Sequence, residues 1–127
     1  MARAVTGLLP FPLIGDRVRV DPPDGTGHAT IVRLADAAVA GHLVLERDGD
    51  ALCVRELCID TAARGFGLGS EAARLVREAS ARAGWASLRA WAPPDLGLAV
   101  YFWSRMGLRP LHGEGPGGGI AFERRLA

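Results

Sequence analysis

The sequence predicts an α/β fold built on one central mixed sheet of about six strands, mostly antiparallel and flanked by helices. Two observations lead to this prediction. Runs rich in Val, Ile and Leu fill the first half of the chain, and two segments with apolar residues at helical spacing follow in the second half. A chain of 127 residues, 49% of them hydrophobic, buries one core, so we expect one domain.

The charge balance excludes several classes of function. All 15 basic residues are Arg, and 14 Asp and Glu bring the net charge to +1. Nucleic-acid binding is not expected, because a phosphate footprint needs a basic excess. A chain without Lys also has neither a Walker-type phosphate loop nor Schiff-base chemistry.

The cysteines and the apolar runs indicate a cytoplasmic protein without a membrane segment. The apolar runs are shorter than the roughly 18 residues that span a bilayer. Cys53 and Cys58 are expected on opposite faces of one strand, about 16 Å apart, beyond the reach of a disulfide. With three scattered His, no spacing of metal ligands is present.

The first 26 residues read as an extended leader with a short edge strand, and residues 27–127 as the remainder of the domain. Four prolines punctuate the leader, and residues 17–20 alternate between Arg and Val. Strands are predicted over residues 28–34, 37–46 and 52–60, with a hairpin turn over residues 47–50.

The second half predicts two helices. Apolar residues at helical spacing and Glu71 in the first turn predict a helix over residues 70–83, which Gly84 ends. A strand over residues 86–92 precedes a second helix over residues 96–106, with Asp95 as its N-cap and Gly107 as its end. Strands over residues 108–112 and 120–126 finish the chain, joined by a glycine-rich loop.

The segment between the third predicted strand and the first helix carries a candidate binding site. Its sequence is Arg64-Gly65-Phe66-Gly67-Leu68-Gly69-Ser70. Small residues there let backbone N–H groups converge at the positive end of the helix dipole, which favours a phosphate group. A tight turn without a ligand is the alternative. A dinucleotide fingerprint fits less well, because Ser70 stands where that pattern needs a third Gly.

Two motifs resemble the GNAT superfamily of N-acetyltransferases. The first is Leu57-Cys58-Ile59 followed by the loop at residues 64–69, and the second is residues 99–108, AVYFWSRMGL. The resemblance covers residues 28–126 and implies that the loop amides bind the pyrophosphate of acetyl-CoA while the strand backbone pairs with its pantetheine arm. The cofactor-binding residues so implied are Leu57, Cys58, Ile59, Arg64, Gly65, Phe66, Gly67, Leu68, Gly69, Ser70, Trp103 and Arg105.

The sequence departs from the family pattern at three places. Leu96 occupies the position of a frequent Asn. Trp103 occupies the position of the Tyr that often protonates the departing thiolate, and an indole cannot supply that proton near neutral pH. Residues 20–28 leave no room for the two helices that form much of the acceptor pocket. Such a reduced site stays open to a large acceptor such as a protein terminus, is completed by a second chain as in a homodimer, or has lost catalysis.

Glu56 is the candidate general base. An amine is protonated at neutral pH, so attack on a thioester requires a group that removes a proton. Glu56 precedes Leu57 in the strand beside the expected thioester. The alternative is a cross-strand ion pair with Arg33 or Arg89. For the three histidines, the sequence gives no placement.

The resemblance therefore implies an acyl-CoA-dependent N-acyltransferase that transfers acetyl from acetyl-CoA to an unidentified amine by direct attack. The alternative is a non-catalytic module of the same fold that senses acetyl-CoA or pairs with a partner subunit. A structural domain without a cofactor is the third alternative.

Overall fold

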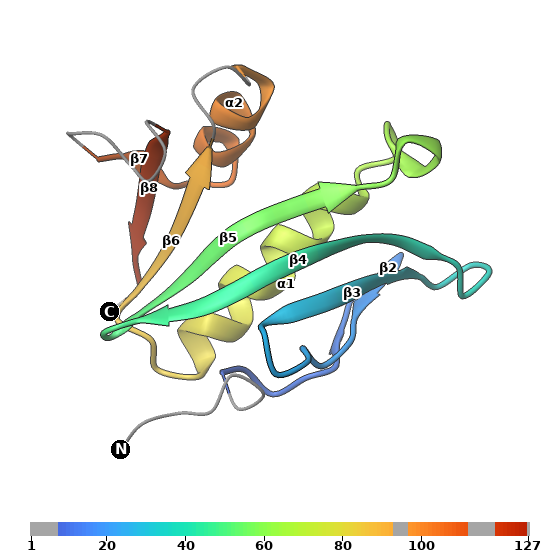
Figure 1. Ribbon diagram of the computed structural model, residues 1–127, viewed down its shortest axis with the longest axis horizontal. Helices are drawn as coiled ribbons and strands as arrows, with labels where there is room; N and C mark the ends of the chain where they lie inside the picture. The colour runs from blue at the N-terminus through green and yellow to red at the C-terminus, as the bar shows by residue number, and fades with distance from the viewer. Residues whose placement is uncertain (1–7, 93–96, 112–118, 127) are drawn as a thin grey trace.

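The computed structural model describes residues 8–92, 97–111 and 119–126. Its centre is one sheet of eight strands with the order β1-β2-β3-β4-β5-β6-β8-β7. Figure 1 shows the arrangement. In chain order the elements are β1 (Leu13–Ile14), β2 (Val18–Val20), β3 (His28–Arg33), β4 (Val39–Asp48), β5 (Ala51–Ile59), the 3-10 turn η2 (Thr61–Ala63), α1 (Leu68–Arg82), β6 (Ser87–Ala92), α2 (Gly97–Arg105), β7 (Arg109–Pro110) and β8 (Ile120–Arg125).

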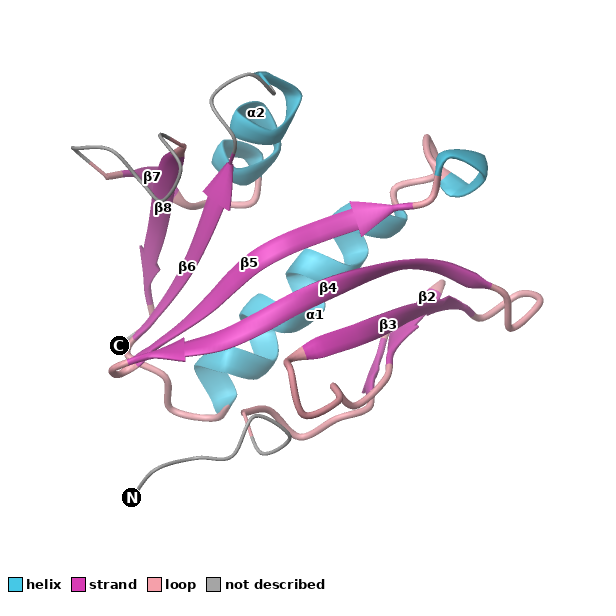
Figure 2. Ribbon diagram, in the orientation of Figure 1, coloured by secondary structure: helices cyan, strands magenta, loops and turns pink. Residues whose placement is uncertain are grey.

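The sheet is antiparallel except at one junction. β5 pairs in parallel with β6 from Ala51↔Ser87 to Val54↔Ala90, and α1 makes the crossover between them. Beyond Val54 the two strands separate, and Figures 1 and 2 show them diverging from a common origin near the C-terminus. The last part of β5 therefore has an edge that faces an opening in the sheet.

The sheet has eight strands rather than the expected six or so. The hydrogen-bonded ladder ends at its two edges in β1 and β7, which have two residues each. β7 lies within the strand predicted over residues 108–112, whereas β1 is not predicted, because two residues are too few to show a hydrophobic pattern. β1 and β2 both lie in the segment expected to be a leader, and both belong to this sheet. Asp95 and residues 112–118 lie outside the described part of the chain.

Both predicted helices are present, with changed ends. α1 begins at Leu68, two residues early, because Gly67 adopts a left-handed conformation (φ 74°) and caps it. Gly84 (φ 86°) and Gly107 (φ 90°) follow the two helices in the left-handed conformation typical of helix ends. Arg77 of α1 donates a hydrogen bond to the Met106 carbonyl at the end of α2, which joins the two helices.

The core lies between the sheet and the helices. Its largest fully buried hydrophobic side chains are Phe122, Leu8, Ile31, Leu43, Leu45, Leu52 and Leu88. α1 contacts β1, β2, β5 and β6, while α2 contacts β6 and β7. In Figure 2, α1 passes behind β4 and β5, and none of the described helices covers the face of these strands turned toward the viewer.

A short turn connects β2 to β3. Residues 21–27 contain no helix, as the sequence predicts. Asp24 holds this turn closed by accepting hydrogen bonds from the backbone N–H of Thr26 and His28. Among the described residues no helix is long and apolar enough to cross a membrane.

Candidate functional site

A β-bulge in β5 directs the side chains at the opening of the sheet. Val54 pairs with Leu45 and Glu56 with Val44, so Arg55 is an extra residue in β5. Because opposed residues of a ladder share a face, the bulge reverses the alternation after Val54. Glu56 consequently lies on the face opposite α1, whereas Leu57 opposes the buried Leu43 on the α1 side.

Because of the same bulge, the two cysteines lie on one face of β5, which differs from the prediction. Cys53 opposes Glu46 and Cys58 opposes His42, so both lie on the face opposite α1 rather than on opposite faces. Both are free thiols. Burial, together with the nearby carboxylates of Glu46 and Asp48, raises the pKa of the Cys53 thiol to about 11.

Glu56 pairs with a histidine rather than with an arginine. His42 Nε2 lies 3.1 Å from Glu56 Oε1, and the two side chains are 41% and 56% exposed. Neither suggested arginine partner is used, because Arg33 pairs with Asp36, and Arg89 pairs with Glu123 and Asp48. The sequence gives His42 no placement, since the pair depends on the register of β4 against β5.

His28 of β3 lies beside the pair formed by His42 and Glu56. Its ring centroid lies 6.2 Å from that of His42. The Thr26 hydroxyl lies 2.6 Å from Asp24 Oδ1, to which it donates its single proton, and 2.8 Å from His28 Nδ1. His28 Nδ1–H therefore donates to Thr26, which leaves His28 Nε2 as an acceptor in the neutral ring.

The segment of residues 64–70, here called the glycine loop, follows β5 on the α1 side of the sheet. Gly65 and Gly67 have φ values of 88° and 74°, which a residue with a Cβ adopts only at a cost. Arg64 Nε donates a hydrogen bond to the Ile59 carbonyl at 2.8 Å, so its side chain folds back onto the end of β5. A Cβ at Gly69 would lie 3.2 Å from Ile59, so the small residue lets α1 approach the strand.

A hollow of about 180 Å³ opens at the start of α1. It is lined by Ile59, Ala63, Arg64, Gly65, Gly67, Leu68, Gly69, Ser70 and Phe102. The N–H groups of Leu68, Gly69 and Ser70 precede the first intrahelical hydrogen bond, in which Glu71 N donates to the Gly67 carbonyl. N–H groups at a helix start that have no intrahelical acceptor are suited to bind a phosphate group.

The α2 residues predicted to bind cofactor lie in different environments. Trp103 is 5% exposed and packs in the core, edge-to-face with Phe102 at 5.0 Å between ring centroids. Phe102 lines the hollow and Trp103 does not. The Arg105 guanidinium lies 5.7 Å from the centroid of the Tyr101 ring, which is largely exposed.

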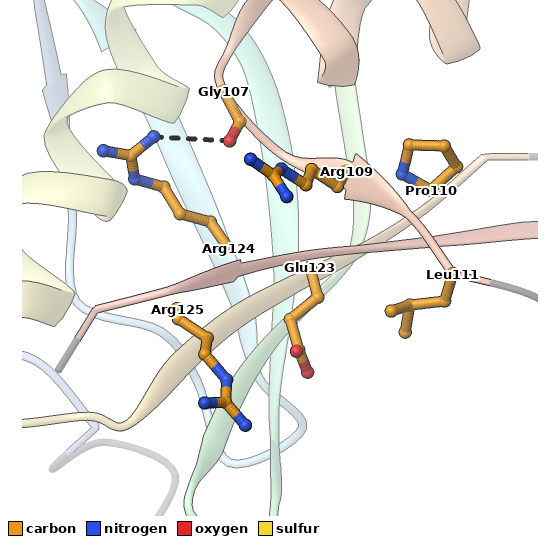
Figure 3. Close-up of a pocket in the computed structure, with 7 residues that line it drawn as sticks. All are labelled: Gly107, Arg109, Pro110, Leu111, Glu123, Arg124 and Arg125. Atoms are coloured by element: carbon orange, nitrogen blue, oxygen red, sulfur yellow. Dashed lines mark hydrogen bonds between the residues drawn. The ribbon is translucent and has the colours of Figure 1, made fainter.

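A second hollow of about 460 Å³ is more basic but less suited to a site. Figure 3 shows its lining residues Gly107, Arg109, Pro110, Leu111, Glu123, Arg124 and Arg125. Arg124 donates a hydrogen bond to the Gly107 carbonyl, and Glu123 is paired with Arg89. The Arg124 and Arg125 guanidinium groups point in opposite directions from β8, so they do not converge on one anion (Figure 3).

The fold agrees with those of solved structures. No family model and no curated protein matches the sequence. A GNAT-family acetyltransferase from Bacillus anthracis superposes with a TM-score of 0.70 at 12% identity, over 79% of this chain and 66% of its own. The protein has the GNAT fold. The resemblance of the two sequence motifs is thereby confirmed at the level of the fold.

Two further acetyltransferase structures superpose on the chain in the same way. The ribosomal-protein-S18-alanine N-acetyltransferase from Escherichia coli gives a TM-score of 0.66 at 12% identity, over 90% of this chain and 72% of its own. A Bacillus subtilis acetyltransferase in complex with CoA gives 0.66 at 12% identity, over 80% of this chain and 78% of its own. The chain thus spans about two thirds to three quarters of the length of these acetyltransferases.

Proposed function

We propose that the protein is an acyl-CoA-dependent N-acyltransferase that transfers acetyl from acetyl-CoA to an amine. The observation that carries the proposal is the arrangement around β5. The glycine loop lies at the end of β5 on the α1 side, and Glu56 lies on the other face, at the point where β5 and β6 separate. The two faces of one opening thus offer a coenzyme site and a proton acceptor.

The chain's own backbone would hold the coenzyme. The N–H groups that precede the first hydrogen bond of α1 would bind the diphosphate, with Ser70 and the loop glycines lining the contact. Residues 55–59 of β5 have no partner in β6, so the backbone of Leu57 and Cys58 offers an edge to an extended amide chain. This amide chain would extend to Ile59, whose carbonyl already accepts a hydrogen bond from Arg64. Phe102 would form the apolar wall of the site, with the buried Trp103 packed edge-to-face against it, and Arg105 would be a further phosphate contact.

Glu56 would accept the proton of the attacking amine. Bound acetyl-CoA supplies a thioester carbonyl, which is the group attacked. The ammonium form of the amine would first lose one proton to solvent. The neutral nitrogen would then form a bond to that carbon as the carbon–sulfur bond breaks, and the second proton would pass from nitrogen to the Glu56 carboxylate. Trp103 donates no proton at neutral pH, so the sulfur leaves as a thiolate, which a thiol pKa near that of Cys (about 8.5) tolerates.

The acceptor would approach from the face that none of the described helices covers. The short connection at residues 21–27 leaves this face of β3, β4 and β5 open. We propose an acceptor as large as a protein terminus. Completion of the site by a second copy is the competing arrangement, and light scattering of the purified chain, which separates monomer from dimer, decides between them.

A binding module without catalysis is the second candidate. Trp103 is buried and stands where the family often has the Tyr that protonates the departing thiolate, which favours a binding module without catalysis. Both candidates bind acetyl-CoA, and only the first releases CoA in the presence of an amine. We also propose that residues 1–26 and 27–127 form one domain. The free cysteines support a cytoplasmic location.

The coenzyme site is tested by a charge placed at Ser70. Ser70→Glu brings a carboxylate to the first turn of α1, and Ser70→Gln is the control of the same shape. Calorimetric titration with acetyl-CoA should show a loss of affinity of about tenfold or more for Ser70→Glu relative to Ser70→Gln, because like charges repel. Equal affinities in the two variants would place the coenzyme elsewhere.

A further inference from the structure

The buried carboxylate of Glu71 in α1 binds the hairpin formed by β1 and β2, here called the N-terminal hairpin. Glu71 is 5% exposed, and its Oε2 accepts hydrogen bonds from the backbone N–H groups of Arg17 and Val18, both at 2.7 Å. The side chains of Arg17 and Arg74 approach its Oε1 to 3.6 and 3.9 Å. A Cβ at Gly15 would lie 2.8 Å from this carboxylate, so a small residue is needed there. The turn between β1 and β2 is thus fixed against the first turn of α1.

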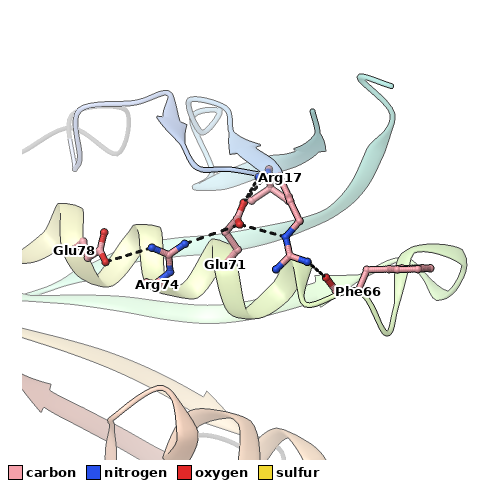
Figure 4. Close-up of polar contacts among 6 residues, drawn as sticks. Arg17, Phe66, Glu71, Arg74 and Glu78 are labelled. Carbon is pink, nitrogen blue, oxygen red and sulfur yellow. Dashed lines mark hydrogen bonds and ion pairs between the residues drawn. The ribbon is translucent and has the colours of Figure 1, made fainter. Parts of the chain in front are cut away.

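From this fixed position the Arg17 side chain reaches the glycine loop. Its Nη1 donates a hydrogen bond to the Phe66 carbonyl at 2.7 Å, and its Nη2 lies 3.2 Å from the position a Cβ would take at Gly67 (Figure 4). One guanidinium therefore lies against both the buried carboxylate of the helix and the loop peptide that precedes the helix. Charge-assisted hydrogen bonds of this kind are about twice as strong as neutral ones.

The peptide that Arg17 holds is the one that presents Gly67 N–H. In a planar trans peptide the C=O and N–H groups point in opposite directions. The Phe66 carbonyl points to Arg17, so the Gly67 N–H points away from it. Gly67 lines the hollow at the start of α1, whereas Arg17 lines a separate hollow of about 540 Å³ behind the loop, together with Phe66 and Leu68.

We propose that Arg17 is a positioning residue for the coenzyme site: it fixes the Phe66–Gly67 peptide so that Gly67 N–H faces the diphosphate. This inference rests on the proposed function and adds a contribution from the N-terminal hairpin, which lies outside both sequence motifs. Arg17 itself does not touch the coenzyme. Its effect passes through the geometry of the loop.

The variant Arg17→Met tests the proposal without dismantling the hairpin. The backbone N–H of residue 17 still reaches Glu71, and the Met side chain replaces the aliphatic stem. Arg19→Met is the matched control, because Arg19 belongs to β2 and pairs with Asp21. Arg17→Lys should restore part of the effect, since an ammonium group donates one hydrogen bond to a carbonyl.

Two measurements are needed. Amide ¹⁵N relaxation of the free protein should show order parameters of residues 65–69 falling in Arg17→Met and staying unchanged in Arg19→Met. Calorimetry with CoA should show an affinity about tenfold lower for Arg17→Met and a native affinity for Arg19→Met.

The outcomes separate the two proposals. Unchanged order parameters in Arg17→Met overturn the positioning role, and so does an increased mobility of the loop that leaves CoA affinity within twofold of the native value. If the native protein does not bind CoA, the proposed function fails. The hold of Arg17 on the loop is then decided by relaxation alone, where unchanged mobility overturns it.

Discussion

At the scale of single residues, the sequence motif identifies Glu56 as a candidate but does not predict its orientation. Its place before Leu57 identifies it as a candidate base, but the alternation of a regular strand would put it on the same face as Val54. The extra residue Arg55 reverses that alternation and brings Glu56 to the open face beside His42. A bulge depends on tertiary pairing, so neither this orientation nor the His42 contact could be read from the sequence.

Replacement of Glu56 by Gln should lower turnover while leaving coenzyme binding intact. The amide keeps the shape of the side chain but cannot accept a proton, so kcat should fall by roughly 10²- to 10⁴-fold. Steady-state kinetics with an amine acceptor, together with calorimetry with acetyl-CoA, makes the measurement. Glu46→Gln is the control, because Glu46 pairs with Arg55 on the same face of the sheet. A rate equal to that of the native protein would remove Glu56 from the mechanism.

The Cys53 thiol should be unreactive at neutral pH. Burial and neighbouring carboxylates raise its pKa from 9.0 to about 11. At pH 8 its thiolate fraction, and with it the rate of alkylation by iodoacetamide, should be about a hundredfold below that of an ordinary thiol. Because the thiol is neutral in the folded state, its contribution to stability is complete below pH 9 and is lost as the pH rises through 11. Mass spectrometry of Cys53 across pH 7–11 measures this. A rate that levels off near pH 9 contradicts the assignment.

At the scale of elements, the sequence predicts what depends on local pattern. A helix predicted over residues 70–83 and the hairpin between β4 and β5 follow from spacing and turn residues, and the structure contains both, with the helix at Leu68–Arg82. The contact between the β1–β2 hairpin and α1 could not be predicted from such local patterns. Glu71 reads as an ordinary acidic residue in a first helical turn, and only the packed structure shows that it is buried beneath β2.

Truncation of Glu71 should therefore destabilise the whole domain. Glu71→Ala leaves the backbone N–H groups of Arg17 and Val18 without their acceptor, at a cost of about 2–4 kcal/mol in the free energy of unfolding. Chemical denaturation measures the loss. Glu78→Ala, a change to an exposed residue of the same helix that pairs with Arg74, should cost less than about 0.5 kcal/mol. Equal costs for the two variants would show that Glu71 contributes no more than a surface ion pair.

At the scale of the whole molecule, the two motifs and their separation predict the fold. The order of the eight strands, which the motifs do not give, determines where the sheet opens. The single parallel junction between β5 and β6 produces the opening, and the glycine loop and Glu56 lie on its two sides. Strand order arises from contacts distant in sequence, so composition and periodicity do not determine it. The short connection from β2 to β3 is the exception, since seven residues cannot hold two helices.

The central claim is that the opening between β5 and β6 binds an acyl-CoA. Titration of ¹⁵N-labelled protein with acetyl-CoA, followed by amide chemical shifts, tests this claim most directly because it reports affinity and location together. We predict the largest shifts at residues 57–59 and 64–70, with a Kd in the micromolar range. An absence of binding, or shifts confined to the basic hollow around Arg109, Arg124 and Arg125, would contradict the account.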